Sequence, residues 1–258
     1  MCHDNASSPP AENPSRVQQE IRFHSDDGFA VRGYFAAEGG RAANNCIVLI
    51  HDVFGPSEFY RQLANRYADR GLPCLLVDIY SRQPAIDVSD AAQVTARRAA
   101  LDQQLAIRDC AAANSWLRSQ GAQRVTIVGF CLGGTLSIIA PARADFDASV
   151  VFYGVPRRRR EWSSLEPISP IDDRVFGRVP MLGFWGDRDE VVGLQNVVEF
   201  DEMLAAEGVP HEFHYVPGLP HSYLTFTPGD AAYETSLAHF DRSCDFSCNA
   251  ILQKKTAP

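Results

Sequence analysis

The chain has 258 residues, of which 45% are hydrophobic and 22% are charged, and its formal net charge is -8. This composition is typical of a globular protein and excludes a fibrous, coiled-coil or wholly disordered chain. The acidic balance argues against a nucleic-acid partner and against binding to a membrane surface, because both need a basic face. No apolar run approaches the roughly 18 residues of a membrane span. We therefore expect one α/β domain of ordinary size.

The seven cysteines and the N-terminal sequence predict a cytoplasmic protein. The cysteine count is odd, and a chain of this length does not need disulfides to stabilise its core. The first residues lack the apolar segment of a secretory signal. We expect a reduced protein that is a monomer or a small homo-oligomer.

The first elements expected along the chain are a tail and a hairpin. Residues 1–17 are rich in Ser, Pro, Asn and Ala, which predicts a flexible tail and leaves residues 18–258 for the domain. Alternating apolar positions then flank Asp26, Asp27 and Gly28. An Asp-Gly pair between two such stretches predicts a β-hairpin, here at an antiparallel edge of the sheet.

Six short apolar runs follow, and they are typical of strands buried on both faces of a parallel sheet. They lie at residues 46–50, 74–79, 125–128, 148–153, 180–185 and 211–216. Between the runs, apolar residues recur at helical spacing in 59–68, 101–117 and 197–204, and a further helix is expected over 135–144. This alternation predicts a mostly parallel, doubly wound sheet with helices on both faces.

An irregular segment at residues 154–179 is the natural place for a lid or a pocket wall. It contains the run Arg157 to Arg160. Arginine runs mostly face water, so we interpret this run as a solvated loop. The alternative interpretation is a local patch that attracts anions near a site.

A reactive cysteine is predicted where the third parallel strand runs into the sequence GFCLGG at residues 129–134. In this G-x-C-x-G-G pattern, Gly129 and Gly133 remove the Cβ atoms that would clash as the chain reverses. The N-terminus of the following helix favours a thiolate at Cys131. The Leu132 amide is then placed to stabilise an oxyanion.

A cysteine nucleophile needs a base, and the base needs an orienting acid. His221 follows the last predicted strand, and Asp187 and Asp189 follow the strand before it, so all three lie at carboxyl ends of strands. We favour Asp189 over Asp187. His51 is a rival base, but its place after the first central strand predicts that it lines the pocket. No metal site is predicted, because the histidine and cysteine pairs of the chain lack the geometry or the number of ligands.

The chain resembles the dienelactone hydrolase family of α/β-hydrolases over roughly residues 45–245. The resemblance is carried by VLIHDVFG at 48–55, VDIYSRQ at 77–83, VGFCLGG at 128–134, FYG at 152–154, GDRDEVV at 186–192 and PHS at 220–222. It implies hydrolysis of a dienelactone, a carboxymethylene butenolide, with Cys131 as nucleophile, His221 as general base and Asp189 as its partner. It also implies an oxyanion hole made by the amides of Val53 and Leu132, and no cofactor.

Two departures from the family pattern affect the expected substrate. The family has a glutamate just before the oxyanion residue, where this chain has Asp52, and an arginine four residues after the catalytic histidine, where it has Thr225. A second family arginine falls near Arg97 and Arg98. A neutral hydroxyl cannot supply the charge-assisted clamp that an arginine gives to a carboxylate. The departures weaken the dienelactone assignment more than the hydrolase assignment.

The sequence therefore predicts a cysteine-dependent hydrolase of a small lactone or carboxylic ester that acts through an acyl-enzyme. The alternatives are a broad-specificity small-ester hydrolase and a non-catalytic protein on the same fold that senses redox state or binds a ligand through its thiol. The expected partner is a small-molecule ester or lactone. Aromatic side chains are expected to flank the pocket: Phe54, Tyr80, Tyr153, Trp185 and Tyr223.

Overall fold

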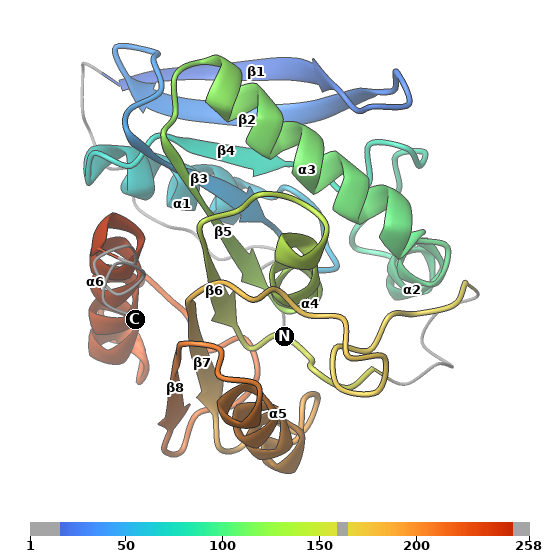
Figure 1. Cartoon of the computed structure of the whole chain (residues 1–258), viewed down its shortest axis with the longest axis vertical. Coiled ribbons are helices and arrows are strands. Elements are labelled where there is room, and N and C mark those ends of the chain that lie inside the picture. The colour runs from blue at the N-terminus through green and yellow to red at the C-terminus, as the bar shows by residue number, and fades with distance from the viewer. Residues whose placement is uncertain (1–15, 159–164, 250–258) are drawn as a thin grey trace.

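A mostly parallel β-sheet organises the chain (Figure 1). The computed structural model describes residues 16–158 and 165–249, and within them eight strands form one sheet of order β1-β2-β4-β3-β5-β6-β7-β8. The strands are β1 Arg16–His24, β2 Ala30–Glu38, β3 Asn45–Ile50, β4 Cys74–Val77, β5 Arg124–Phe130, β6 Ala148–Phe152, β7 Met181–Gly186 and β8 His211–Val216. The pairs β1–β2 and β2–β4 are antiparallel, and the other pairs are parallel. The predicted α/β class and its antiparallel N-terminal edge are confirmed.

Helices cover both faces of the sheet, as the sequence predicts. They are α1 Glu58–Asp69, α2 Ala91–Ala99, α3 Gln103–Ser119, α4 Leu132–Ile139, α5 Leu194–Ala206 and α6 Tyr233–Asn249. Side chains alternate along the buried strands, so that Ile47 and Leu49 of β3 pack in the core with α1 and α6. Val48 and Ile50 pack in the second core with α3 and α4. Each face of β3 is therefore apolar, which explains its unbroken hydrophobic run.

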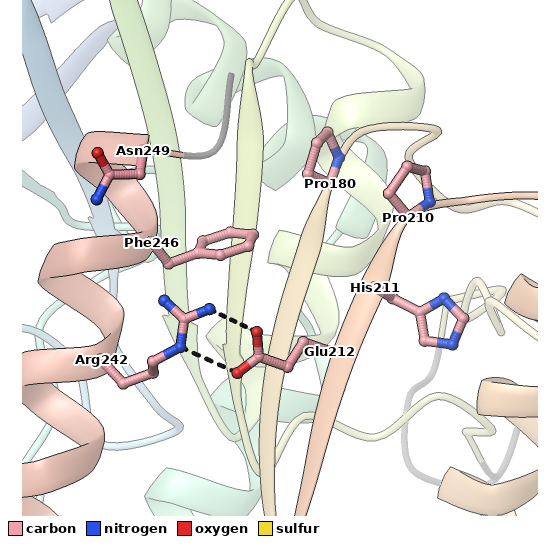
Figure 2. Close-up of a pocket in the computed structure, with 7 residues that line it drawn as sticks. All are labelled: Pro180, Pro210, His211, Glu212, Arg242, Phe246 and Asn249. Atoms are coloured by element: carbon pink, nitrogen blue, oxygen red, sulfur yellow. Dashed lines mark hydrogen bonds and ion pairs between the residues drawn. The ribbon is translucent and has the colours of Figure 1, made fainter. Parts of the chain in front are cut away.

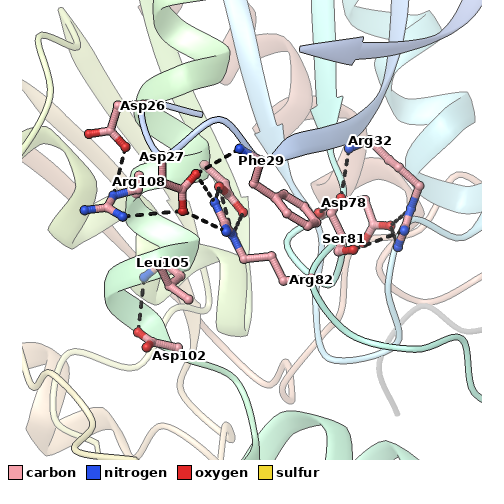
Figure 3. A network of polar contacts seen from close by, with 11 residues as sticks. Asp26, Asp27, Phe29, Arg32, Asp78, Ser81, Arg82, Asp102, Leu105 and Arg108 are labelled. Carbon is pink, nitrogen blue, oxygen red and sulfur yellow. Dashed lines mark hydrogen bonds and ion pairs between the residues drawn. The ribbon is translucent and has the colours of Figure 1, made fainter. Parts of the chain in front are cut away.

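The hairpin turn is fixed to α3 by a network of charges (Figure 3). Arg82 donates to the buried carboxylate of Asp109 on α3 at 2.7 Å and pairs with Asp27 in the turn at 2.9 Å. Arg108 pairs with Asp26 at 2.9 Å. The hydrogen bond from Arg82, with a second from the Phe29 amide, lowers the pKa of Asp27 to about 2. The edge hairpin is thus held by ion pairs as well as by its ladder.

Several element boundaries differ from the sequence prediction. β1 begins at Arg16, so residues 16 and 17 belong to a strand rather than to the expected tail; residues 1–15 lie outside the described part of the chain. The helix expected at 135–144 begins earlier, at Leu132, and its last turn is a 3₁₀ helix at Ala140–Ala142. The described parts of the irregular segment, 154–158 and 165–179, contain neither helix nor strand. Across residues 16–158 and 165–249, no helix has the length and apolarity to cross a membrane.

Candidate active site

The cysteine at the end of β5 lies in a strained turn between strand and helix. Cys131 has φ 52° and ψ -111°, a left-handed conformation that costs free energy for any residue other than glycine. The turn requires its two flanking glycines. A Cβ on Gly129 would lie 2.0 Å from the Gly133 oxygen, and a Cβ on Gly133 would lie 2.4 Å from the Ile50 oxygen. The predicted elbow is therefore present, and the start of α4 packs directly against the end of β3.

The acid and the histidine meet on the loops that follow β7 and β8. His221 Nδ1 lies 2.7 Å from Asp189 Oδ2, and the side chain of Asp189 is almost fully buried. The other carboxylate oxygen accepts hydrogen bonds from the amides of Val191 and Val192, each at 2.9 Å. Asp187 instead accepts from the Gly218 amide at 2.7 Å. Of the two candidate acids, Asp189 is the one that contacts the imidazole.

Tyr153 connects this pair to the cysteine. The Cys131 amide donates to the Phe152 oxygen at 3.0 Å, and the ring of the next residue, Tyr153, lies 5.2 Å from the His221 ring in an edge-on contact. Tyr153 and Ser222, like Cys131, have positive φ, at 41° and 57°. Three of the four non-glycine residues with positive φ in the described chain therefore belong to this one region. Such strain is kept where the surroundings fix a functional geometry.

The loop after β3 carries the second expected oxyanion amide. Leu132 is the first residue of α4 and has no intrahelical acceptor for its N–H, while Val53 lies in the turn after β3. Asp52 is fully buried, and its carboxylate accepts from the Phe54 amide at 2.8 Å. The Arg97 guanidinium donates to the Val53 oxygen at 3.1 Å. Both charged side chains hold this loop in place.

His51 does not line a pocket as the sequence suggests, because it is fully buried. Its Nδ1 lies 2.7 Å from the Asp52 oxygen, so this nitrogen must donate. Its Nε2 then accepts from the Ile79 amide at 3.3 Å, and Asp78 Oδ1 is 3.7 Å away. Both ring nitrogens therefore have partners within the fold. His51 supports the oxyanion loop and has no nitrogen left to act as a base.

Three of the predicted pocket residues line one cavity of about 270 Å³, namely Phe54, Tyr80 and Arg97. The Arg97 guanidinium stacks over the Tyr80 ring at 4.1 Å. Burial raises the pKa of Tyr80, and the charges that act on it include those of Arg97, Arg98 and Cys131. The Arg97 guanidinium and the Tyr80 ring therefore pack together in the wall of this cavity.

Comparison with known proteins identifies the family. The model of the dienelactone hydrolase family matches residues 31–246. The chain belongs to the dienelactone hydrolase family. It is 27% identical to a carboxymethylenebutenolidase of Rhodococcus opacus over 251 residues, covering 95% of this chain and 96% of the relative. It is 30% identical to a carboxymethylenebutenolidase of Pseudomonas putida, covering 93% of this chain and 99% of the relative.

Solved structures agree on the fold. A candidate dienelactone hydrolase from Klebsiella pneumoniae superimposes with a TM-score of 0.80 at 22% identity, covering 90% of this chain and 98% of that one. An esterase of Pyrococcus furiosus superimposes with a TM-score of 0.66 at 15% identity, covering 93% and 96%. At these identities the likeness establishes the α/β-hydrolase fold and nothing finer.

Two predicted pocket residues of this dienelactone hydrolase family member have other roles. Trp185 is fully buried, and its indole N–H donates to the Gly154 oxygen at 2.8 Å, so it belongs to the core. Thr225 binds Asp230 through its hydroxyl at 2.6 Å, so it ties its own loop together. The sequence suggested Trp185 because it lies close to the end of a strand, and Thr225 because it stands where the resembled family has an arginine.

The arginine run contains a buried residue, which the solvated-loop interpretation does not predict. Arg157 is half-exposed and pairs with Asp172 at 3.2 Å and Glu199 at 2.8 Å, as expected for a solvated loop. Arg158 is only 7% exposed, so the solvated-loop interpretation is wrong for this residue. Residues 159 and 160 lie outside the described part of the chain.

A second cavity lies near the amino ends of β7 and β8 (Figure 2). It has a volume of about 130 Å³, and it is lined by Pro180 and Pro210, which precede β7 and β8, and by Glu212 and Arg242, which pair across it. The loops that carry Asp189 and His221 leave the other ends of these strands, so this cavity is separate from the candidate active site. Within the described residues, no group of three or more His, Cys, Asp and Glu side chains has the arrangement of a metal site.

Proposed function

We propose that this member of the dienelactone hydrolase family is a cysteine-dependent hydrolase of a small carboxylic ester or lactone. The nucleophile is Cys131, the general base is His221, and the orienting acid is Asp189. The observation that carries the proposal is the 2.7 Å contact between His221 and Asp189, next to a strained cysteine at a helix N-terminus. The carboxymethylenebutenolidases among the relatives support the ester or lactone class.

The hydrogen bonds of Asp189 determine which proton moves. A carboxylate only accepts, so His221 Nδ1 carries a proton toward Asp189 and Nε2 is left as the base. Nε2 takes the proton from the Cys131 thiol, and the sulfur attacks the carbonyl carbon. The amides of Leu132 and Val53 stabilise the negative oxygen that forms. The alcohol then leaves with the proton from His221, which produces an acyl-enzyme.

Water completes the cycle in the same geometry. His221 Nε2 removes a proton from the water, and the resulting hydroxide attacks the thioester carbon. The second tetrahedral intermediate uses the same oxyanion amides. Its collapse releases the carboxylic acid and returns the proton to the Cys131 sulfur. A lactone follows the same steps, except that its alcohol remains joined to the acyl group.

The test is steady-state hydrolysis of a dienelactone and of p-nitrophenyl acetate. The wild type is compared with Cys131→Ala and with Cys244→Ala, a matched control because Cys244 is a buried cysteine of α6 outside the site. We expect Cys131→Ala to abolish turnover and Cys244→Ala to retain it. The preferred substrate then separates a dienelactone hydrolase from a broad-specificity small-ester hydrolase.

The proposal fails if the wild type hydrolyses neither substrate or if Cys131→Ala keeps its rate. Loss of both activities in the wild type would favour the non-catalytic alternative, a thiol that senses redox state or helps to bind a ligand. Peptide mass spectrometry of Cys131 after mild peroxide treatment would then test the redox interpretation, because a reactive thiolate oxidises first.

A further inference from the structure

The loop that carries the candidate base, His221, is anchored to α6 through a hydroxyl group. The buried side chain of Tyr223, two residues after His221, has its oxygen 2.7 Å from His239 Nδ1 on α6. Between His221 and Tyr223, Ser222 has φ 57°, a left-handed conformation that costs free energy. Such a conformation persists only where the surrounding contacts fix it. The contact between Tyr223 and His239 is one of these, and it lies outside the proposed triad.

A second contact holds the same loop to the same face of α6. The Thr225 amide donates to Ser236 Oγ at 3.0 Å, and Ser236 is fully buried. Ser236 and His239 are three residues apart on the helix, so their side chains lie on one face of it. α6 therefore binds the histidine loop at two points, one through a backbone amide and one through a side chain. A change at His239 removes one anchor and leaves the other.

His239 is a neutral hydrogen-bond acceptor. Its ring stacks on Phe184 of β7, with centroids 4.4 Å apart, and the ring of His214 on β8 lies 5.9 Å away. Burial, together with the charge of His214, lowers the pKa of His239 to about 4, so the ring is neutral near pH 7. A neutral imidazole has one nitrogen without a proton. The Tyr223 hydroxyl is the donor to that nitrogen, because a phenol is the more acidic of the two groups.

The anchored residue reaches the base through Tyr153. The Tyr153 ring makes edge-on contacts with the rings of His221 and Tyr223, with centroids 5.2 Å and 5.7 Å apart. A movement of Tyr223 therefore changes the packing of His221. The base depends on that packing, since its Nδ1 must keep the 2.7 Å contact with Asp189 to leave Nε2 for the thiol. A displacement of about 1 Å at a reacting group can cost about 100-fold in rate.

We propose that His239 is a positioning residue for the general base: it holds the Tyr223 hydroxyl and so keeps the His221 ring aligned with Asp189. The inference rests on the proposed function, because it adds a residue of α6 to the same site. The hydrogen bond acts on the chemical step rather than on substrate binding, so its loss should lower kcat and leave KM nearly unchanged. One hydrogen bond contributes about 3- to 10-fold in rate.

The first test is a double-mutant cycle on p-nitrophenyl acetate hydrolysis, with kcat, KM and Tm measured for each variant. Tyr223→Phe removes the donor, and His239→Leu removes the acceptor. We expect either change to lower kcat about 3- to 10-fold with KM within about twofold, and the double variant to be no slower than the single ones. His239→Asn should recover most of kcat, because the asparagine oxygen can accept in place of Nδ1.

His214→Leu is the matched control. It removes a histidine ring that also stacks on Phe184, at 5.0 Å, but whose Nε2 lies 2.7 Å from Glu212 rather than from the loop. We expect this variant to keep the kcat of the wild type. A fall equal to that of His239→Leu would show that the stack on Phe184 matters and the hydrogen bond does not, which would overturn the inference.

The double variant separates positioning from simple stability. Each single change leaves one polar group without its partner, whereas the double variant replaces both partners by apolar groups, so its Tm should return towards that of the wild type. A positioning role predicts that kcat stays low in the double variant despite that recovery. Unchanged kcat in the single variants, recovery of kcat together with Tm, or effects that multiply in the double variant would each overturn the inference.

The second test needs no ester turnover. The proton on His221 Nδ1 lies in the 2.7 Å contact with Asp189, and its downfield proton NMR signal is identified by its absence in His221→Ala. We expect its exchange with water to quicken about 3- to 10-fold in His239→Leu and to stay unchanged in His214→Leu. Equal exchange in the wild type and His239→Leu would refute the positioning role. Faster exchange in a protein without esterase activity would refute the proposed function and retain the role of His239 in holding the ring.

Discussion

Replacing Asp189 with asparagine changes one atom and should disable the base. In the native site, one carboxylate oxygen accepts from His221 Nδ1 at 2.7 Å and the other accepts from the amides of Val191 and Val192. The two amides require an acceptor, so the asparagine oxygen stays with them and its NH₂ group faces His221. The imidazole must then accept at Nδ1, which puts its proton on Nε2. That nitrogen no longer removes the thiol proton.

The expected loss in Asp189→Asn follows from the fraction of molecules with the wrong tautomer. In catalytic triads this exchange lowers kcat by about 10⁴, and each tenfold step is about 1.4 kcal/mol. The Cys131 thiol ionises more readily than a serine hydroxyl, which reduces its dependence on the base. We therefore expect kcat/KM for p-nitrophenyl acetate to fall by about 10³, or about 4 kcal/mol of transition-state stabilisation.

The assay is p-nitrophenyl acetate hydrolysis at neutral pH, with thermal unfolding as a check that the variant folds. Asp187→Asn is the matched control, because it makes the same exchange two residues earlier on a side chain that accepts from a loop amide, that of Gly218. We expect this control to stay within about threefold of the wild type. A fall of less than about tenfold in Asp189→Asn, or an equal fall in Asp187→Asn, would refute the tautomer argument.

Three further predictions concern stability and specificity. Gly133→Ala should lower the free energy of unfolding in urea by about 2 kcal/mol, because its Cβ would lie 2.4 Å from a backbone oxygen; an unchanged value would contradict the packing of the elbow. Asp27, whose pKa the hydrogen bond from Arg82 lowers to about 2, should stabilise the fold above its unfolded pKa and lose this effect as pH falls from about 4 to 2. The stability difference between wild type and Asp27→Asn should therefore shrink over that range, and a constant difference would exclude the linkage. Thr225→Arg should leave the ratio of kcat/KM for mono-(p-nitrophenyl) glutarate over p-nitrophenyl pentanoate within about twofold, because the Thr225 side chain is directed to Asp230; a rise in the ratio would show that the new side chain reaches the substrate.

Local sequence patterns predict most of the strands and the N-terminal hairpin. The apolar runs identify the strands because both faces of the sheet are buried, and the Asp-Gly pair identifies the hairpin because its turn needs a positive φ, which Gly28 has at 81°. Helix α2 was missed because it buries only Val94 and so shows no apolar stripe. Its N-cap was readable, since Asp90 accepts from the amides of Ala92 and Gln93. The start of β1 was missed because a mostly exposed edge strand resembles a tail in composition.

The positions of the candidate site residues could be predicted where a backbone motif fixes them. The orientation of long side chains could not, because it depends on tertiary contacts. The glycines around Cys131 and the chain order of Asp189 and His221 are features of sequence. The direction of a long side chain depends on tertiary contacts, which is why adjacent Arg157 and Arg158 differ, one paired with surface acids and one buried. For the same reason Trp185, expected at the pocket, packs in the core and binds the Gly154 oxygen.

The most direct test of the account is to identify the residue that carries the acyl group. The wild type is mixed with excess p-nitrophenyl acetate, whose good leaving group makes deacylation the slow step, quenched with acid and digested for mass spectrometry. We predict one acetyl group on the peptide that contains Cys131, and none on that peptide in Cys131→Ala. Turnover in the wild type with that peptide unmodified, or with the acetyl group on another residue, would contradict the central claim.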